Sequence, residues 1–439
     1  MPTSRELTPE SLPLTRDPSA WATLAAAILA SLSLLIVPLA CAPDLIDRFR
    51  IVKESVMRAE AIIGLLFVVI AIAFGAMPRV REMLRERALF AIAVAGLLWA
   101  ALTTLTSTHR AISIESLISI SAAIVLFLVV WFAAPRIRLI AIDLLVLAGA
   151  INAVLITLQE YSIYNPFKTH ENLTAHLGAT AFIGNPNIVG SYLALVAVIL
   201  VSAAIAIRGL RRAWYILGAL LAIGGVLVSD TETAVVALAA GLVLVAIGSS
   251  WKRAVALGIV IVAIVAAGLA LRIPVISDLL ALPQRIAKDG LEVAVSGRVA
   301  PALVALRMTR EHPITGTGPG TYGFHFMPER SRLAAESNGQ IGLGLGVNFG
   351  EVHNDHLQLL AEGGIPAYLL FLGAMATLIV IARRPRDDGD TRWRFVRTLA
   401  IPLAGTIFVL CLAQFPLQVA ATRHLIITMA ALIAGWSRA

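Results

Sequence analysis

Long runs of apolar residues recur along the whole chain, and they limit its possible folds more than any other feature. Each run is about 18 to 25 residues long, the length that a helix needs to cross the hydrocarbon core of a bilayer. Only 14% of the residues are charged, against about 25% in soluble globular proteins. Because a bilayer offers no partners to open backbone groups, such runs must fold as helices. The chain is therefore expected to be an all-α polytopic membrane protein.

The runs predict about twelve transmembrane helices. The expected domain organisation is a leader at 1–19, spans one to nine within 20–272, one large loop at 273–355 and spans ten to twelve within 356–436. The first run is too long for the core of a cleaved signal peptide. The expected spans lie near residues 20–41, 58–76, 88–106, 113–134, 137–158, 187–207, 213–228, 232–248, 253–272, 356–382, 398–414 and 417–436.

Lysine and arginine set the expected orientation, because short loops that carry them stay in the cytoplasm. With twelve spans, the five basic segments fall on one side of the membrane, together with both termini. The net charge of +8 then reflects topology, and nucleic acid is not an expected partner. These segments are residues 77–87, 135–138, 208–213, 249–253 and 383–397.

Three segments on the expected outer side carry polar residues, and two cysteines lie near outer ends of spans. The segments are 42–57 with Arg48, Arg50 and Lys53; 159–186 with His170, Glu171 and His176; and the long loop at 273–355. Cys41 and Cys411 could meet in the fold, although two separate thiols are favoured over a disulfide.

The long loop is expected to contain structure of its own, since formless loops beyond about 15 residues are uncommon. Residues 298–311 predict an amphipathic helix, with Arg298, Arg307 and Arg310 on its polar faces. A glycine-rich turn, HPITGTGPGTYGF at 312–324, follows. Its glycines have dinucleotide-fingerprint spacing but lack a βαβ context. They indicate a tight turn, a bare backbone that a substrate approaches closely, or both.

The stretch EVHNDHLQLLAEGG at 351–364 gathers titratable groups in an otherwise apolar chain. Asp355 with Gln358 resembles a capping box, which would leave His353 just outside the tenth span. A Gly-Gly-Ile-Pro break follows, where Pro366 should kink the helix. Three interpretations stay open at this point. His353 is a general base; or His353, His356, Asp355 and Glu351 bind a divalent metal; or these are polar residues at a membrane surface.

Four stretches, in order, resemble the O-antigen ligase and polymerase superfamily. VHNDHLQLLAEGGIPAYLLF is similar to its histidine-asparagine hallmark, and SGRVAPALVALRMTREHPITGTGPGTYGF resembles its loop segment. TAFIGNPNIVGSYLAL is similar to its sixth-span entry, and AQFPLQVAATRHLIITMAALIAG to its last span. The likeness covers roughly residues 180–436, with the large loop where ligases have it.

This resemblance implies a glycosyltransferase at the periplasmic face of the bacterial inner membrane. Such enzymes move a glycan from undecaprenyl diphosphate to a hydroxyl of the lipid A core in ligases, or of another lipid-linked glycan in polymerases. It implies that His353 deprotonates the acceptor and that Arg298 binds the diphosphate, with no cofactor, metal or nucleotide. The other candidates for substrate binding are Arg307, Arg310, Arg48, Arg50 and Asn354, while His356 and Glu362 would support the site without touching substrate.

The chain departs from this family at the outer start of the eighth span. Members often carry an arginine there, whereas this chain reads SDTETAVVAL, with Glu232 at that place. A second phosphate-binding arginine is therefore missing, and Arg48, Arg50, Lys53 or Arg110 could replace it unless the donor differs.

Ligase is the leading interpretation, because polymerases tend to have two substantial outer loops and this chain has one long loop. Polymerase is the second. A transporter or flippase is the alternative from another class, since twelve spans with cytoplasmic termini are typical of secondary transporters. Against it, the polar residues gather at the outer edge and not at mid-membrane.

Overall fold

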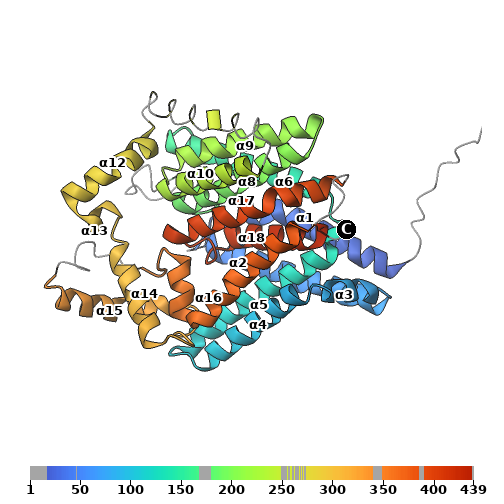
Figure 1. Cartoon of the computed structure of the whole chain (residues 1–439), viewed down its shortest axis with the longest axis horizontal. Helices are drawn as coiled ribbons and strands as arrows, with labels where there is room; N and C mark the ends of the chain where they lie inside the picture. Colours follow the sequence, from blue (N-terminus) through green and yellow to red (C-terminus); the bar gives the residue numbers. More distant parts are fainter. Residues whose placement is uncertain are drawn as a thin grey trace, which may run out of the picture.

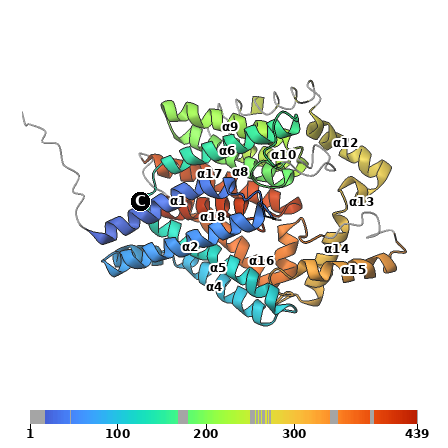
Figure 2. The ribbon, with the colours of Figure 1, turned by 180° about the vertical axis from the view of Figure 1, so that it is seen from behind.

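The computed structural model describes residues 17–45, 47–167, 179–248, 273–339, 349–384 and 390–437, with isolated positions between 255 and 270. Every regular element in these residues is helical, as the sequence predicts. Figures 1 and 2 show a bundle of long helices with a group of shorter helices at one end.

Nine helices in the described residues are long and apolar enough to cross a membrane, and two shorter apolar helices accompany them. The long ones are α1 (Pro18–Leu39), α2 (Arg50–Ala73), α4 (Arg87–Leu105), α5 (Arg110–Ala133), α6 (Ile140–Glu160), α8 (Pro186–Ala206), α9 (Leu210–Val228), α16 (Asp355–Ala382) and α17 (Thr391–Ala413). The shorter ones are α10 (Glu232–Ile247) and α18 (Ala420–Trp436).

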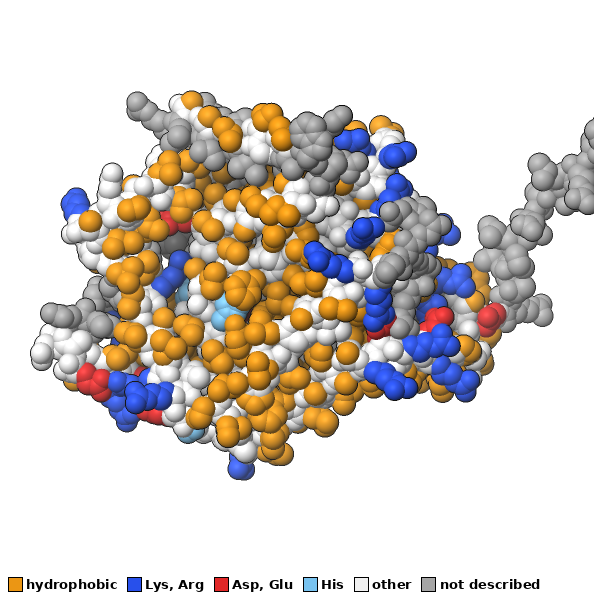
Figure 3. Space-filling model, in the orientation of Figure 1, with side chains coloured by type: hydrophobic (Ala, Val, Ile, Leu, Met, Phe, Trp, Pro, Cys, Tyr) orange, Lys and Arg blue, Asp and Glu red, His pale blue; other side chains and the backbone are white. Residues whose placement is uncertain are grey.

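These helices lie where eleven of the expected spans were placed. The remaining expected span, 253–272, lies mostly outside the described residues, so the count of twelve stays a prediction. A short helix, α3 (Met77–Leu84), and a 3-10 turn, η1 (Ala134–Arg136), occupy two of the basic segments. Figure 3 shows hydrophobic side chains over the middle of one face, with lysine and arginine gathered toward the end that holds α3.

The expectation of an outer loop at 42–57 was wrong for its second half, because α2 already begins at Arg50. Asp47 starts the helix by accepting the backbone N–H of Arg50 at 2.8 Å. Of the basic side chains that suggested a loop, Lys53 turns inward and is buried. Lys53 donates to the carbonyl oxygens of Ala40 and Phe182. Hydropathy alone placed the start of the span too late.

Helix α8 lies at the centre of one half of the bundle and is buried over most of its length. It contacts α6, α9, α10 and α17, which is the environment that an all-round apolar helix requires. In the other half α4, α5 and α16 pack together, while α1, α2 and α18 lie between the two groups (Figures 1 and 2).

The long loop forms four helices at the end of the bundle opposite α3 (Figure 1). They are α12 (Pro274–Asp289), α13 (Leu291–Ala294), α14 (Val299–Glu311) and α15 (Tyr322–Glu336). Helix α14 matches the amphipathic helix expected at 298–311. Its buried residues Val304 and Met308 form a small core with Tyr322 and Phe326 from α15 and Ala361 from α16. The loop is therefore anchored on the start of α16.

The glycine-rich turn packs against a break in α16, backbone to backbone. The N–H groups of Thr317 and Gly318 donate to the carbonyl oxygens of Ala361 and Glu362, both at 3.0 Å. The N–H of Ile365 donates to Pro313 O at 2.9 Å. Gly364 breaks the helix with a φ of 71°, just before Pro366. The bare backbone of the turn serves close approach to α16, which agrees with the tight-turn interpretation.

Replacing Gly364 with alanine should detach this turn. An added Cβ would lie 1.9 Å from Ile314 O, and the positive φ would strain any side chain. We expect Gly364→Ala to lower the free energy of unfolding by more than about 1 kcal/mol, measured by thermal unfolding in detergent. Gly373→Ala in the same helix is the control, because its Cβ would meet only Ile92, at 3.7 Å. Equal melting temperatures for the two variants would contradict this account of the break.

Candidate active site

His353 lies immediately before α16 and has an unusual backbone, with a φ of 57°. Asn354 fixes this geometry from the next position. Its side chain caps α16 by accepting Leu357 N–H at 2.9 Å, and its Nδ2 donates to Leu412 O on α17 at 2.8 Å. The helix cap is thus Asn354. The capping-box pattern predicted Asp355, the next residue, instead. Left-handed backbone at a non-glycine residue carries strain, which the surrounding structure must hold.

The imidazole of His353 stands between two aromatic rings. Ring centroids of Phe349 and Phe415 lie 5.3 and 4.7 Å away, both edge-on. Its Nδ1 is buried and has no hydrogen-bond partner among the described residues. Burial, and then the positive charge of Arg298, lowers the pKa of His353 to about 4. At neutral pH the ring is therefore uncharged and can accept a proton.

Arg298, the residue that precedes α14, acts on this histidine through its positive charge. Burial lowers the pKa of its guanidinium group, and the carboxylate of Glu232 acts in the opposite direction. Glu232 lies in the first turn of α10, so three segments far apart in sequence converge here. The positive charge of Arg298 thus acts on His353 in the structure, while the roles of both residues in the reaction stay predictions.

Arg285 is a neighbour that sequence reasoning missed. It projects from α12, forms an ion pair with Glu232, and donates to Asp278 O at 3.0 Å. Its Nε is buried without a hydrogen-bond partner in the described residues. The departure at Glu232 was the signal in the sequence that could have found Arg285. A carboxylate in place of an arginine suggests a cation that pairs with it, and in the structure this cation is Arg285 on the long loop. None of the four replacements named from sequence is paired with Glu232 in the described residues.

The remaining candidate arginines lie elsewhere. Arg50 pairs with Glu351 at 2.6 Å, two residues before His353. Arg307 joins α14 to α15 through Glu329 and Glu336. Arg310 is exposed in the last turn of α14, and Arg48 lies partly buried before α2. Of this group only Arg50 is linked to the histidine segment, and substrate binding by any of them stays a prediction.

Two other candidates have clear structural partners. Glu362 is buried and accepts the N–H groups of Gly320 at 2.8 Å and Tyr322 at 3.1 Å, so it holds the glycine-rich turn. His356 is buried between α16 and α17, where its Nε2 lies 3.0 Å from Phe408 O. Both therefore hold the start of α16 against its neighbours, and their role in the reaction stays a prediction.

The residues considered as metal ligands point to different partners. Asp355 accepts the N–H of Leu417 at 2.8 Å and the side chain of Gln418 at 3.2 Å, whereas His356 faces Phe408. Glu351 pairs with Arg50. In the parts of the chain that the structure describes, no three His, Cys, Asp or Glu side chains converge as a ligand set. His170, Glu171 and His176 lie outside the described residues.

The two cysteines do not form a disulfide in the structure. Cys41 is partly buried after α1, and Cys411 is buried in α17, where its thiol lies 3.9 Å from the carboxylate of Asp355.

Comparison with known proteins gives one family match. Residues 217–372 match a family model described as O-antigen ligase. The matched region is well under half of the chain, but it includes Glu232, Arg285, Arg298 and His353. A search of curated proteins found no match.

The ionisation of His353 offers a test of this geometry that does not require a substrate. In protein with isotope-labelled histidine, NMR titration should show His353 still neutral at pH 5.5, because its pKa lies at about 4. Arg298→Gln should raise that pKa by removing the nearby positive charge. Arg307→Gln is the control, since the charge of Arg307 is already paired with Glu329 and Glu336. A His353 pKa near 6.5 in the unsubstituted protein would contradict the buried position.

Proposed function

We propose, since the family match supports membership of the O-antigen ligase and polymerase superfamily, that this protein transfers a glycan from undecaprenyl diphosphate to an acceptor hydroxyl. The observation that carries the proposal is an uncharged, buried His353 with a free Nδ1 beside Arg298. The reaction would take place at the periplasmic face of the bacterial inner membrane, with both termini in the cytoplasm. The single long loop favours ligase, with the lipid A core as acceptor.

In this mechanism His353 accepts the proton of the acceptor hydroxyl as its oxygen attacks the anomeric carbon. A new carbon–oxygen bond forms, and the bond from that carbon to the diphosphate oxygen breaks with its electron pair. The diphosphate leaves with this pair as an anion. Direct displacement of this kind inverts the anomeric configuration.

Arg298 and Arg285 are proposed to bind the departing diphosphate. Guanidinium groups match phosphate oxygens with two parallel hydrogen bonds, and positive charge stabilises the charge that develops on the leaving group. Glu232 pairs with Arg285 and its charge acts on Arg298, so it would position Arg285 while the two arginines leave a net positive charge. Bound diphosphate would also offset Arg298 and make His353 more basic when substrate is present.

One structural observation favours the transporter alternative. Glu60 on α2 and His424 on α18 form a buried pair at 2.9 Å, and ionisable pairs inside membranes often belong to transport pathways. The proposed site and this pair lie on different helices, so variants can separate the two functions.

His353→Ala should abolish glycan transfer. Loss of a general base costs about a hundredfold or more in rate, measured with purified protein, a lipid-linked donor and candidate acceptors. His312→Ala is the control, because His312 is exposed on the loop. In cells, lipid-linked glycan should accumulate on the outer leaflet. Accumulation on the inner leaflet would indicate transport instead.

Arg298→Ala and Arg285→Ala should each reduce kcat/KM for the donor by about tenfold to a hundredfold, the value of one charge-assisted hydrogen bond. Arg310→Ala should leave it within about twofold, because Arg310 is exposed at the far end of α14. Exchange of the pair, Glu232→Arg with Arg285→Glu, should restore part of the loss. An Arg285→Ala protein with unchanged kinetics would remove Arg285 from the proposed site.

A further inference from the structure

The segment between α17 and α18, residues 415–418, packs around the residue proposed as the base. The ring centroid of Phe415 lies 4.7 Å from that of His353. The N–H of Leu417 donates at 2.8 Å to Asp355, two residues after the histidine. The position of the imidazole therefore depends on where residues 415–418 lie.

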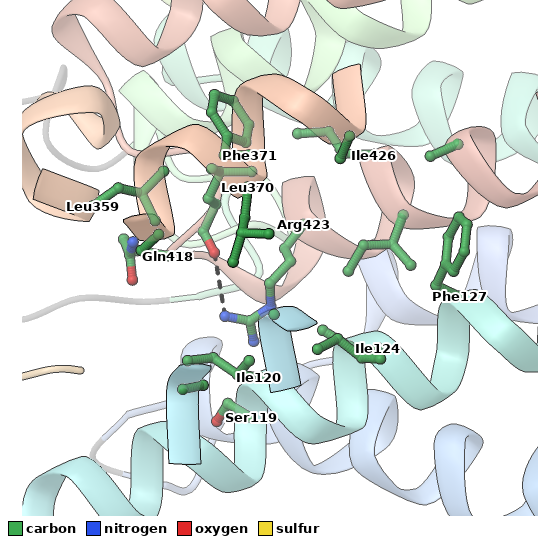
Figure 4. A pocket seen from close by; sticks show the side chains of 18 of the residues that line it. Ser119, Ile120, Ile124, Phe127, Leu359, Leu370, Phe371, Gln418, Arg423 and Ile426 are labelled. Atoms are coloured by element: carbon green, nitrogen blue, oxygen red, sulfur yellow. Dashed lines mark hydrogen bonds between the residues drawn. The ribbon is translucent and has the colours of Figure 1, made fainter. Parts of the chain in front are cut away.

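Helix α18 fixes this segment from its own first residues. Thr422 Oγ1 donates to Pro416 O at 2.5 Å, and Arg423 Nη1 donates to Leu417 O at 3.3 Å. Gln418 and Arg423 line the same pocket, which Figure 4 shows. Because these bonds join the segment to α18, a shift of the helix along its axis would move the segment with it.

His424, the next residue, ties α18 to α1 and α2 inside the bundle. Its side chain is buried, and its Nε2 lies 2.9 Å from a carboxylate oxygen of Glu60 on α2 and 3.1 Å from Ser33 Oγ on α1. Ser33 donates its own hydroxyl proton to Ala30 O at 2.9 Å. This network assigns a proton to Nε2, so that the histidine donates and the two oxygens accept.

Such a contact specifies the position of a membrane helix better than apolar packing does. After His424, α18 reads LIITMAALIAGW, which is nearly all apolar and would still meet apolar neighbours after a shift. A buried donor that loses its acceptor costs about 1–3 kcal/mol, so an interhelical hydrogen bond opposes the shift. Glu60 Oε1 is buried and has no hydrogen-bond partner among the described residues, so this carboxylate depends on His424. The contact therefore favours one register of α18.

We propose that Glu60 and His424 position the base for the transfer reaction: their contact sets the register of α18, which holds residues 415–418 against His353. Both are positioning residues, because they act through Phe415 and its neighbours and not on substrate. The proposal rests on the proposed function, since the base that it positions is His353. It also gives the buried pair a role other than transport.

The test compares two amides in place of the imidazole. In His424→Gln the amide reaches the place of Nε2 and can still donate to Glu60, whereas the shorter amide of His424→Asn reaches only the place of Nδ1. His424→Gln should therefore keep the register, and His424→Asn should lose it. Because both variants lack the ring, the comparison isolates the contact with Glu60.

The first measurement is an NMR titration of isotope-labelled His353 in the full chain in detergent, without substrate. The unsubstituted protein and His424→Gln should both show a pKa of about 4 for His353. In His424→Asn this pKa should rise by about one unit or more toward 6.5, the ordinary value for histidine, because the imidazole loses its enclosure by Phe415.

The second measurement is the rate of glycan transfer. In His424→Asn kcat should fall about tenfold or more, while KM for the donor stays within about twofold, because the long loop carries Arg298 and Arg285. His424→Gln should keep kcat within about threefold of the unsubstituted protein, because the donor to Glu60 is preserved.

Trp436→Phe is the control for stability. Trp436 Nε1 donates to Ala134 O at 2.8 Å near the far end of α18, so this variant also loses one buried hydrogen bond of the helix. It should melt at a lower temperature than the unsubstituted protein, with the titration of His353 and kcat unchanged.

A double variant answers the case in which His424→Asn does not fold. Glu60→Leu with His424→Leu removes both polar groups, and apolar replacement of a buried pair is often neutral for stability. Since the register is no longer specified, the double variant should change the titration of His353 and kcat as His424→Asn does.

The proposal is overturned if the variant that lacks the contact titrates and transfers as His424→Gln does, or if Trp436→Phe changes His353 equally. Normal transfer by purified His424→Asn, with lipid-linked glycan on the inner leaflet of cells, would also overturn it and assign the pair to transport. The proposed function fails separately, through normal transfer by His353→Ala. The titration of His353 needs no transfer and would still test the register.

Discussion

The backbone contact between the glycine-rich turn and the break in α16 is the constraint on which the site depends. Three inter-segment hydrogen bonds join the turn to residues 361–365, and they form only because Gly364 leaves room for Ile314 O. The carboxylate of Glu362 completes the contact by accepting two further N–H groups from the turn. This contact sets α14 on the start of α16 and so sets Arg298 beside His353.

Electrostatics then decides what the site can do. Glu232 pairs with Arg285 and its charge also acts on Arg298, while burial and then the charge of Arg298 lower the pKa of His353. Because these side chains are partly shielded from water, each charge acts more strongly on its neighbour than it would at the surface. The proposed chemistry needs this combination: an uncharged base, and positive charge ready for an anionic leaving group. An anion that binds in the site would raise the pKa of His353 and offset the positive charge of the arginines at the same time.

Much of the fold could be predicted from the sequence, whereas the site could be predicted only in part. Apolar length located eleven helices, because a span must bury its backbone whatever its neighbours are. It failed at the start of α2, where Lys53 is charged but buried. His353 and Arg298 were found through motif resemblance. Arg285 was not, because no motif links α12 to α10.

The sequence by itself determined that the chain forms apolar helices with one long polar loop, because hydropathy and charge act within each segment. Only the tertiary structure decided which arginines face the histidine, what the glycine turn contacts, and where a cavity remains. Those properties depend on distances between segments that lie far apart in the chain, and no local pattern contains such distances.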